Sequence, residues 1–193
     1  DPDAFLDGSP EFAGKVNFIK SDLKDLSLAN IQVDYCFHMA TTSASETFNE
    51  EDQLNKIDLL YLGTKNLMSE LVKAKVKKIV FTSSGVAYGP LPEGSDYVES
   101  SRMAPLTTNP ASALGEGKRL AEYVIAYYCS SNNISYGIAR CFTFVGPRLP
   151  MNLHYAIGNF IYDALNNESI EVRGTGHDVR SYLYIGDAVS WLL

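Results

Sequence analysis

The stretch KKIVFTSSGVAYG, residues 77–89, decides the fold class. Its first half is rich in β-branched and aromatic residues, and hydroxyl residues and a glycine follow directly. The pattern predicts a strand over Lys78–Ser83 that ends in a tight turn. An apolar run of this kind, without polar alternation, is typical of a parallel strand that is covered on both faces. We therefore predict a parallel sheet flanked by helices.

Strand-like and helix-like segments alternate on either side of this stretch. The other predicted strands are Val16–Lys20, Asp34–Ala40, Ser135–Phe144 and Ile170–Arg173. Apolar residues at helical spacing predict one helix over Leu54–Ala74 and another from Ala113, with start signals at Pro110 and Ser112. A last helix is predicted to open at Asp187, a suitable N-cap. This alternation predicts an α/β fold with a doubly wound parallel sheet.

The first unit of such a sheet is not found in the sequence. A doubly wound nucleotide-binding sheet normally opens with a strand, a Gly-rich turn and a helix whose N-terminus holds a pyrophosphate. The early glycines, Gly8 and Gly14, do not follow a predicted strand, and the last predicted helix is interrupted at Leu193. We therefore expect the 193 residues to lack the first βα unit and the C-terminal part of the fold.

The composition excludes several classes of protein. With 16 Lys and Arg against 23 Asp and Glu, the formal charge is −7, which argues against binding to nucleic acid or to an anionic membrane. Apolar residues make up 46% and charged residues 20%, as in an ordinary globular domain. We find no apolar run of the roughly 20 residues that span a bilayer, and no secretory signal at the start, and we predict a cytoplasmic protein.

The cysteines and histidines do not form a recognisable cluster in the sequence. The three cysteines lie in apolar segments without a CxxC spacing, so we predict free, buried thiols at Cys36, Cys129 and Cys141. The histidines are far apart, and no cysteine or carboxylate lies at a recurrent ligand spacing from His38, His154 or His177. We therefore predict no metal site.

Five segments in a fixed order carry a resemblance to a known family. They are KVNFIKSDLKD (15–25), VDYCFHMAT (33–41), KKIVFTSSGVAYG (77–89), ARCFTFVGPR (139–148) and VRGTGHDVRSYLYIGDAV (172–189). Together they resemble the extended short-chain dehydrogenase/reductases, in particular the NAD-dependent epimerase/dehydratase branch that acts on nucleotide sugars. The resemblance implies a Rossmann fold, NAD as cofactor and a nucleoside-diphosphate sugar as substrate. It implies that residues 1–193 form a partial NAD-binding domain, with the start of the nucleotide-sugar region at about 145–193.

The resemblance also implies the cofactor contacts. In KSDLKD, Asp22 and the backbone amide of Leu23 correspond to the family's adenine contacts; the alternative is that Asp22, at the end of a strand, caps a short helix that follows it. The segment FHMAT matches the strand end beside the cofactor and implies contacts from Met39, Ala40 and Thr41. His38 lies within an apolar strand, so we interpret it as a core histidine.

Ser84 corresponds to the hydroxyl residue that orients the sugar hydroxyl to be oxidised. A hydroxyl at the carboxyl end of a parallel strand points into the crevice where such sheets bind ligands; the alternative is that Ser84 only caps a turn. Dehydratases of the family usually place carboxylates directly after this hydroxyl, but here Gly85 and Val86 follow. The absence of an acid–base pair favours epimerase or ketoreductase chemistry over dehydration.

The family's Tyr-x-x-x-Lys motif is incomplete. In SALGEGKRLAE the lysine is Lys118, and Leu114 stands where the family has the tyrosine that acts as general base. Lys118 still implies a contact to the cofactor ribose, with a solvated surface lysine as the alternative. Three explanations remain open: an inactive binding relative, an enzyme that uses another base such as Tyr88 or a substrate-assisted route, or an altered residue. We interpret Tyr88 itself as a core residue.

The nucleotide-diphosphate contacts are implied by the last two segments. Thr143 replaces an asparagine that reaches the substrate in the family, and Asn159 lies where a short helix approaches the base. Arg180 corresponds to an arginine that clamps a phosphate, for which a guanidinium group is well suited. The alternative for Arg180 is a surface ion pair with Asp178 or Asp187.

Two functional classes follow from these residues. One is an epimerase-like enzyme that transiently oxidises a sugar hydroxyl; the other is a non-catalytic protein that binds NAD or a nucleotide sugar, as Leu114 favours. In the family, the helices corresponding to those from Leu54 and Ala113 often pair across a two-fold axis as a four-helix bundle. We predict a homodimer of this kind, with outward-facing Tyr61, Met68, Tyr123 and Tyr127 at the interface.

Overall fold

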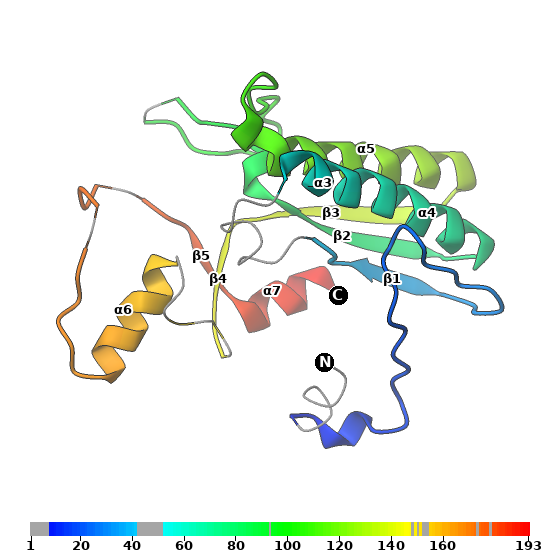
Figure 1. Cartoon of the computed structure of the whole chain (residues 1–193), viewed down its shortest axis with the longest axis horizontal. Coiled ribbons are helices and arrows are strands. Elements are labelled where there is room, and N and C mark those ends of the chain that lie inside the picture. Colours follow the sequence, from blue (N-terminus) through cyan, green and yellow to red (C-terminus); the bar gives the residue numbers. More distant parts are fainter. Residues whose placement is uncertain are drawn as a thin grey trace.

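A parallel sheet with a helical layer on one face forms the centre of the molecule (Figure 1). The computed structural model describes residues 8–41, 52–92, 94–147, 149, 151, 155–172, 174–177 and 179–193. Strands β1 (Tyr35–His38), β2 (Lys78–Ser84) and β3 (Ser135–Cys141) pair in parallel in the order β1-β2-β3. This arrangement confirms the predicted α/β class with a Rossmann-like parallel sheet.

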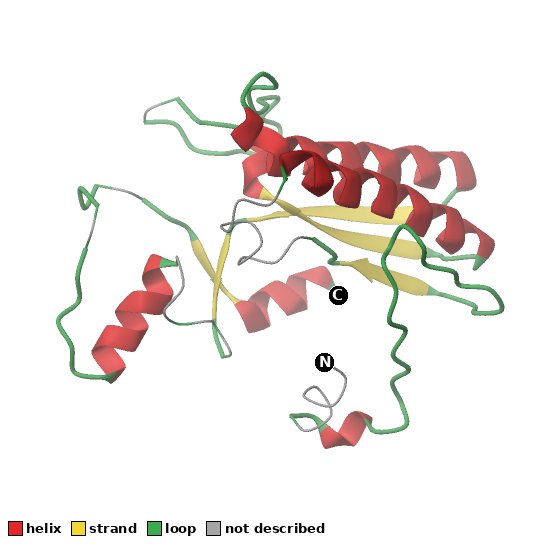
Figure 2. Cartoon of the chain, in the orientation of Figure 1, coloured by secondary structure: helices red, strands yellow, loops and turns green. Residues whose placement is uncertain are grey.

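The helical layer consists of two long segments (Figure 2). The first contains α3 (Gln53–Asp58), a π-helical turn (Leu59–Gly63) and α4 (Thr64–Lys73), close to the predicted Leu54–Ala74. The second is α5 (Ala113–Asn132), which begins at the predicted residue and follows a 3-10 turn at Pro110–Ser112. Asn133 ends α5 in the left-handed conformation.

The core lies between this layer and the sheet. Apolar side chains of α4 and α5 meet those of the strands, and Met68, Ile79, Phe81, Ala121 and Ile125 are fully buried. Burial of this shared apolar surface is the main favourable contribution to folding. The burial of Met68 corrects its predicted place on an outward helix face, because helical spacing alone does not identify which face of α4 meets the sheet.

A second, smaller unit follows β3. The strands β4 (Thr143–Val145) and β5 (Tyr182–Tyr184) pair in parallel, and α6 (Ala156–Leu165) lies between them in the sequence. Helix α7 (Ile185–Leu192) follows β5 directly. Its start corrects the prediction at Asp187: Tyr184, at the end of β5, is the N-cap, and Asp187 falls in the first turn.

Three predicted strands need correction. Residues 16–20 lie in an irregular segment, because no neighbouring strand among the described residues pairs with them, and Phe18 and Ile19 are exposed. The predicted strand 135–144 is divided at Phe142, where the chain leaves the pairing with β2 and joins β5. Residues 170–172 lie outside any strand, and Arg173 lies outside the described residues.

The structure also tests the predictions made for the three cysteines, for Tyr88 and for membrane-spanning segments. Cys36, Cys129 and Cys141 are free thiols; Cys129 is buried, as predicted, whereas the other two are half-buried. Tyr88 is buried, as predicted. Among the described residues, no helix is both long enough and apolar enough to cross a membrane.

Candidate functional site

The candidate site is a cavity at the carboxyl ends of β2 and β3. Ser84 is the last residue of β2, Cys141 is the last of β3, and the strand register places them opposite each other. Ligands bind at this edge of open parallel sheets. A cavity of about 430 Å³ opens there, and five of the predicted residues line it: Met39, Thr41, Ser84, Leu114 and Lys118.

Ser84 is both a cavity residue and a turn cap. Its backbone is extended, and the chain then tightens into a 3-10 turn over Gly85–Tyr88. The hydroxyl oxygen accepts a long hydrogen bond of 3.4 Å from the Val86 amide. The alternative role as a turn cap is therefore present, and the position of Ser84 in the cavity lining leaves its hydroxyl available to a ligand as well.

Lys118 is buried, so its interpretation as a solvated surface lysine is wrong. Its side chain is 3% exposed, and Nζ donates to the backbone carbonyl oxygen of Thr82 at 2.9 Å. Nζ also lies 4.8 Å from the ring centroid of Phe81. Burial lowers the pKa of this amine to about 8, although Cys141 and Glu122 act in the opposite direction.

The Lys118 ammonium has more donors than partners. A protonated lysine carries three N–H donors, and among the described residues Nζ makes one hydrogen bond and no ion pair. A buried donor without an acceptor costs free energy, so the arrangement favours a ligand that brings oxygen acceptors into the cavity.

Leu114 lines the same cavity one helical turn before Lys118. Residues four apart on a helix lie on the same face, so the leucine side chain occupies the place from which a tyrosine would reach the ligand. A leucine carries no exchangeable proton, and the part of the cavity next to it is apolar.

Glu122 continues this face of α5 and connects the helix to both strands. Its carboxylate accepts two hydrogen bonds from Arg140, from Nε at 2.9 Å and from Nη2 at 2.7 Å. It also accepts the Ser83 hydroxyl at 2.5 Å. The Arg140 guanidinium lies 4.3 Å from the ring centroid of Tyr88. This network fixes α5, and with it Lys118, against β2 and β3.

His38 is a core histidine, as predicted. Its side chain is buried at the end of β1, and Nε2 lies 2.9 Å from the hydroxyl oxygen of Thr64. Burial, and secondarily the charge of Lys118, lowers its pKa to about 4. The imidazole is therefore neutral at physiological pH and acts as a structural hydrogen-bonding group.

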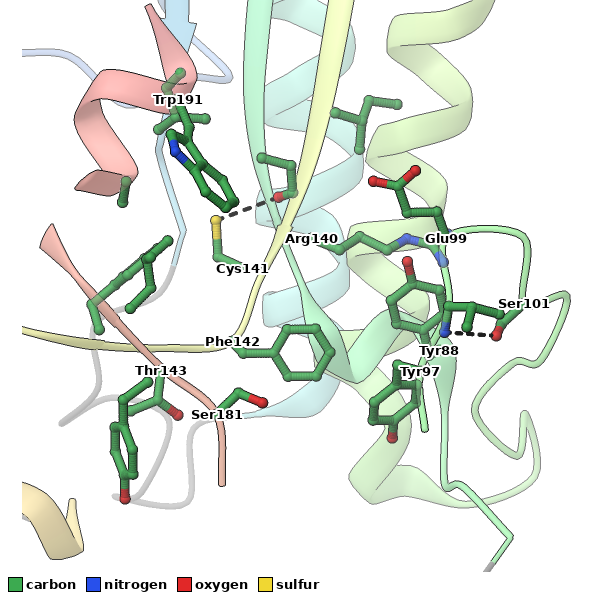
Figure 3. A pocket seen from close by; sticks show the side chains of 18 of the residues that line it. Tyr88, Tyr97, Glu99, Ser101, Arg140, Cys141, Phe142, Thr143, Ser181 and Trp191 are labelled. Atoms are coloured by element: carbon green, nitrogen blue, oxygen red, sulfur yellow. Dashed lines mark hydrogen bonds between the residues drawn. The ribbon is translucent and has the colours of Figure 1, made fainter. Parts of the chain in front are cut away.

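A larger cavity of about 920 Å³ shares lining residues with the first, Phe142 among them, and Figure 3 shows the side chains that line it. The Phe142 ring stacks on Tyr88 at 6.4 Å and contacts Tyr97 at 5.3 Å between centroids. Thr143 and Trp191 of α7 both line this larger cavity. The structure thus places Thr143 beside the group around Ser84 but not in the same cavity lining.

Other predicted residues lie outside the linings of both cavities. Ala40 lies between two lining residues, while Asn159 is within α6. The Asp22 carboxylate accepts from the Lys24 amide at 2.8 Å, so it caps a turn over residues 23–25 and not the short helix of the alternative prediction. The carbonyl oxygen of Leu23 accepts from the Asn66 side chain at 2.7 Å.

Arg180 also lies outside both linings. Its Nη1 donates to the carbonyl oxygen of Val179 at 3.0 Å. Asp178, one of its possible partners, lies outside the described residues, as does His154. The ligand roles of Arg180, Asn159, Asp22 and Leu23 stay predictions. Among the described residues, no group of three His, Cys, Asp or Glu side chains is arranged to hold a metal ion.

Sequence reasoning missed Glu122, Arg140 and Cys141. The spacing contained a signal for the first, because residues 114, 118 and 122 repeat at intervals of four and share one helix face. Arg140 and Cys141 depend on the register between β2 and β3, which the sequence alone does not specify.

A parallel sheet with a ligand cavity at its carboxyl edge defines the Rossmann-like class of nucleotide-binding folds. Within that class, the chain belongs to the NAD dependent epimerase/dehydratase family, whose sequence model matches residues 6–193.

Relatives with established names support this assignment. UDP-glucuronic acid decarboxylase 5 of Arabidopsis thaliana is 32% identical over 189 residues, which cover 96% of this chain and 52% of the relative. The dTDP-D-glucose 4,6-dehydratase of Dictyostelium discoideum is 28% identical over 91% of this chain and 41% of its own length. The chain therefore spans about half the length of these relatives or less.

Solved structures are similar as well. UDP-N-acetylglucosamine 4-epimerase from Methanobrevibacter ruminantium M1, in complex with UDP-N-acetylmuramic acid, has a TM-score of 0.74 and 28% identity, covering 90% of this chain and 55% of that one. UDP-glucose 4-epimerase from Thermotoga maritima, with UDP-glucose, has a TM-score of 0.77. At 22% identity, over 93% of this chain and 60% of its own, the second structure confirms the fold alone.

Proposed function

We propose that this chain forms part of an NAD-dependent protein that oxidises a hydroxyl of a nucleoside-diphosphate sugar, in an epimerase-like reaction. The observation that carries the proposal is one cavity, at the carboxyl edge of the sheet, that is lined by Ser84 and by the buried Lys118. Family membership and the names of the relatives, which act on or bind UDP and dTDP sugars, support the same substrate class.

The residues of the cavity fit the nicotinamide end of NAD. The under-partnered Lys118 ammonium suits ribose hydroxyl oxygens, and Met39 and Thr41 at the end of β1 offer an apolar and a hydroxyl contact. When bound, NAD supplies the hydride acceptor. The Ser84 hydroxyl holds and orients the sugar hydroxyl, and Glu122 keeps Lys118 in place through its bonds to the strands.

The remaining ligand contacts belong to the same proposal. Asp22 and Leu23 hold the adenine, Ala40 contributes backbone contact beside Thr41, and Thr143, Asn159 and Arg180 hold the nucleotide diphosphate of the substrate. The predicted cytoplasmic location also remains part of this proposal.

Binding tests this function before turnover is considered. We expect the full natural protein to bind both NAD and UDP-glucuronic acid in calorimetric titrations. Ser84→Ala should lower the affinity for the sugar nucleotide by an amount that corresponds to one neutral hydrogen bond, about 0.5–1.5 kcal/mol. The affinity for NAD should stay within about twofold. A matched control is Ser131→Ala, at the exposed end of α5 outside the linings of both cavities. Absence of binding for both ligands would contradict the proposal.

Leu114 supports a second candidate, a non-catalytic protein that binds NAD or a nucleotide sugar. The cavity keeps Ser84 and Lys118 but has no phenol on the face of α5 that lines it. Both candidate functions predict that the protein binds NAD or a nucleotide sugar, but only the enzyme is expected to turn the sugar over. Exchange of the sugar epimers in the presence of NAD identifies the enzyme; binding of both ligands with no exchange at any pH identifies the binding protein.

We also propose a homodimer through the outer face of the helical layer. Tyr123 and Tyr127 are 68% and 59% exposed on α5, and their rings stack at 6.5 Å between centroids. Aromatic residues of this kind are enriched at interfaces, and Tyr61 of the neighbouring helix is half-buried. Sedimentation of the full protein should show a dimer that Tyr127→Glu dissociates; a monomer before substitution contradicts it.

A further inference from the structure

Few side chains that line the 430 Å³ cavity are able to take a proton from a substrate. Leu114 is unable to do so, and the hydroxyls of Ser84 and its neighbours are too weakly basic without a partner base. The remaining titratable side chains of the lining are Lys118, Cys141 and Tyr155. Among the described residues of the lining, these three are the candidates for a proton acceptor in the oxidation of a sugar hydroxyl.

We propose that the amine of Lys118 is the proton acceptor in this protein, in place of the phenol that Leu114 cannot supply. This inference rests on the proposed function. In the oxidising step, the O–H bond of the sugar hydroxyl breaks and its proton joins the lone pair of Nζ. The carbon that bears the oxygen gives up its C–H electron pair as hydride to the nicotinamide oxidant, and a C=O bond forms. The reverse step returns the proton from Nζ and the hydride to carbon.

The hydrogen bonding of Lys118 suits both protonation states. A neutral amine has two N–H donors and one lone pair, so Nζ keeps its bond to the Thr82 carbonyl at 2.9 Å whether or not it holds the extra proton. The carbonyl thereby fixes the nitrogen in place while the lone pair remains for the substrate.

The surroundings of Lys118 favour the neutral form at mildly alkaline pH. On α5 the nearest charge is Glu122, which the Arg140 guanidinium of β3 neutralises at 2.7 Å. Burial raises the pKa of the Cys141 thiol of β3, which favours its neutral form; in that form it does not exert the charge effect that a thiolate would have on the lysine. His38 of β1 is neutral, and β2 contributes the Phe81 ring and the Thr82 carbonyl. With a pKa lowered to about 8 by burial, a large fraction of the amine is neutral near that pH.

Cys141 and Tyr155, the other two titratable groups of the lining, are less suitable than Lys118 as proton acceptors. The Sγ of Cys141 donates to the Ala139 carbonyl oxygen at 3.5 Å, and its raised pKa keeps it protonated at neutral pH. Tyr155 is the N-cap residue of α6 and is 39% exposed, so water competes for its phenol. Lys118 is the one member of the three with a buried nitrogen fixed by a hydrogen bond to β2.

The first experiment measures the protonation of Lys118 without any turnover. Lysines of the full natural protein are labelled with ¹³C at Cε, which leaves their N–H groups in place, and the Lys118 signal is assigned by its loss in Lys118→Arg. Its chemical shift should titrate with a pKa near 8. A Lys118 signal with no transition within about one pH unit of that value overturns the inference.

The second experiment links this pKa to the chemistry, with NAD and UDP-glucuronic acid as probes. Turnover should rise with pH along a single titration that matches the amine signal. Lys118→Met should lower turnover by about 10²-fold or more, and Lys78→Met should leave it unchanged. Melting temperature and calorimetric binding of both probes show whether a variant has lost turnover only because it misfolds or no longer binds. In that case the titration of Lys118 in the unaltered protein decides whether the amine can act as the proton acceptor.

The outcomes separate this inference from the function on which it rests. Binding of both probes with turnover that persists in a folded Lys118→Met variant overturns the inference and leaves the proposed function intact. Binding of both probes with no turnover between pH 6 and about 10, the range over which such an amine loses its proton, overturns it as well and favours the binding protein. Failure to bind either probe overturns both.

Discussion

Leu114 and Lys118 lie one turn apart on α5 and line the same cavity, but only the lysine carries an exchangeable proton. This pair determines what the cavity is able to do. The leucine leaves an apolar surface where a tyrosine would place a phenol, and the buried lysine beside it is fixed by the Thr82 carbonyl. Substitution at position 114 therefore tests the chemistry of the site directly.

Leu114→Tyr should raise turnover of a nucleotide sugar. A phenol one turn before Lys118 is placed to act as a general base, whose contribution is typically about 10²–10⁴-fold. The larger ring also risks overpacking, which costs about 1–3 kcal/mol of stability. Turnover and melting temperature are measured together, with Leu114→Phe as the control that adds the ring without the hydroxyl. Equal turnover in the Tyr and Phe variants would contradict the prediction.

Removing the charge of Glu122 should destabilise the protein while preserving its shape. In the unaltered protein, Nε and Nη2 of Arg140 donate to the Glu122 carboxylate at 2.9 and 2.7 Å. Glu122→Gln removes this negative charge and leaves the partly buried guanidinium without a counter-charge. Hydrogen bonds to charged groups contribute about 1.5–3 kcal/mol, and we expect a loss of that order in denaturant unfolding. The control, Glu116→Gln, removes the longer 3.9 Å pair with Arg119 and should change stability by less than about 1 kcal/mol.

His38 should make stability depend on pH in a defined window. Its pKa is lowered from 6.5 to about 4 in the folded state, mainly by burial. As the pH falls below 6.5, the unfolded chain takes up a proton that the folded protein does not. The free energy of unfolding should therefore fall between pH 6.5 and about 4, by about 3 kcal/mol in total.

The matched variants for this prediction are His38→Gln and His177→Gln. The first keeps a hydrogen-bonding group near Thr64 and removes the titration, so the pH dependence should become flatter by that amount. The second makes the same substitution at an exposed histidine outside the core and serves as its matched control. An unchanged slope in His38→Gln would show that the carboxylates alone cause the pH dependence.

Gly115 offers a test of the contact between α5 and the turn after β2. An alanine in a helix is normally more stable than glycine by about 0.5–1 kcal/mol. Here an added Cβ would lie 2.8 Å from the Val86 carbonyl oxygen and 2.7 Å from Cγ of Pro105. We expect Gly115→Ala to be destabilising by about 1–3 kcal/mol, because the backbone carbonyl has no room to move. Gly137→Ala, where nothing lies within 4 Å, should be neutral or slightly stabilising in the same unfolding experiment.

The parts of the fold that the sequence predicted well are those whose pattern is local. The apolar run of β2 placed that strand within one residue of its observed bounds, and the start signals placed the beginning of α5 at its observed residue. Residues 16–20 have the same β-branched and aromatic character but form no strand, because strand formation requires a partner that the pattern cannot identify. Phe142 shows the same limit, since the change of pairing partner after Cys141 depends on where β5 lies.

In the candidate site, too, some residues could be predicted from local patterns and others depend on how distant elements pack. Ser84 and Lys118 were predictable because one ends an evident strand and the other lies at a fixed helical spacing, and the structure brings them to one cavity. The burial of Lys118 and its bond to Thr82 were not predictable, since they depend on how α5 packs against β2. Thr143 lies in the lining of the adjoining cavity because the chain changes its pairing partner after Cys141, and Arg180 lies outside both linings; neither placement is encoded in a local pattern.

The most direct test of the proposed function follows hydrogen from the sugar to the cofactor. The full natural protein is mixed with NAD and UDP-glucuronic acid that carries deuterium on its ring carbons, and the recovered nicotinamide is examined by mass spectrometry. We predict deuterium in the nicotinamide ring, in an amount that rises in Leu114→Tyr. Binding of both ligands with no deuterium in the nicotinamide of either protein would contradict the proposed oxidation and leave a binding protein.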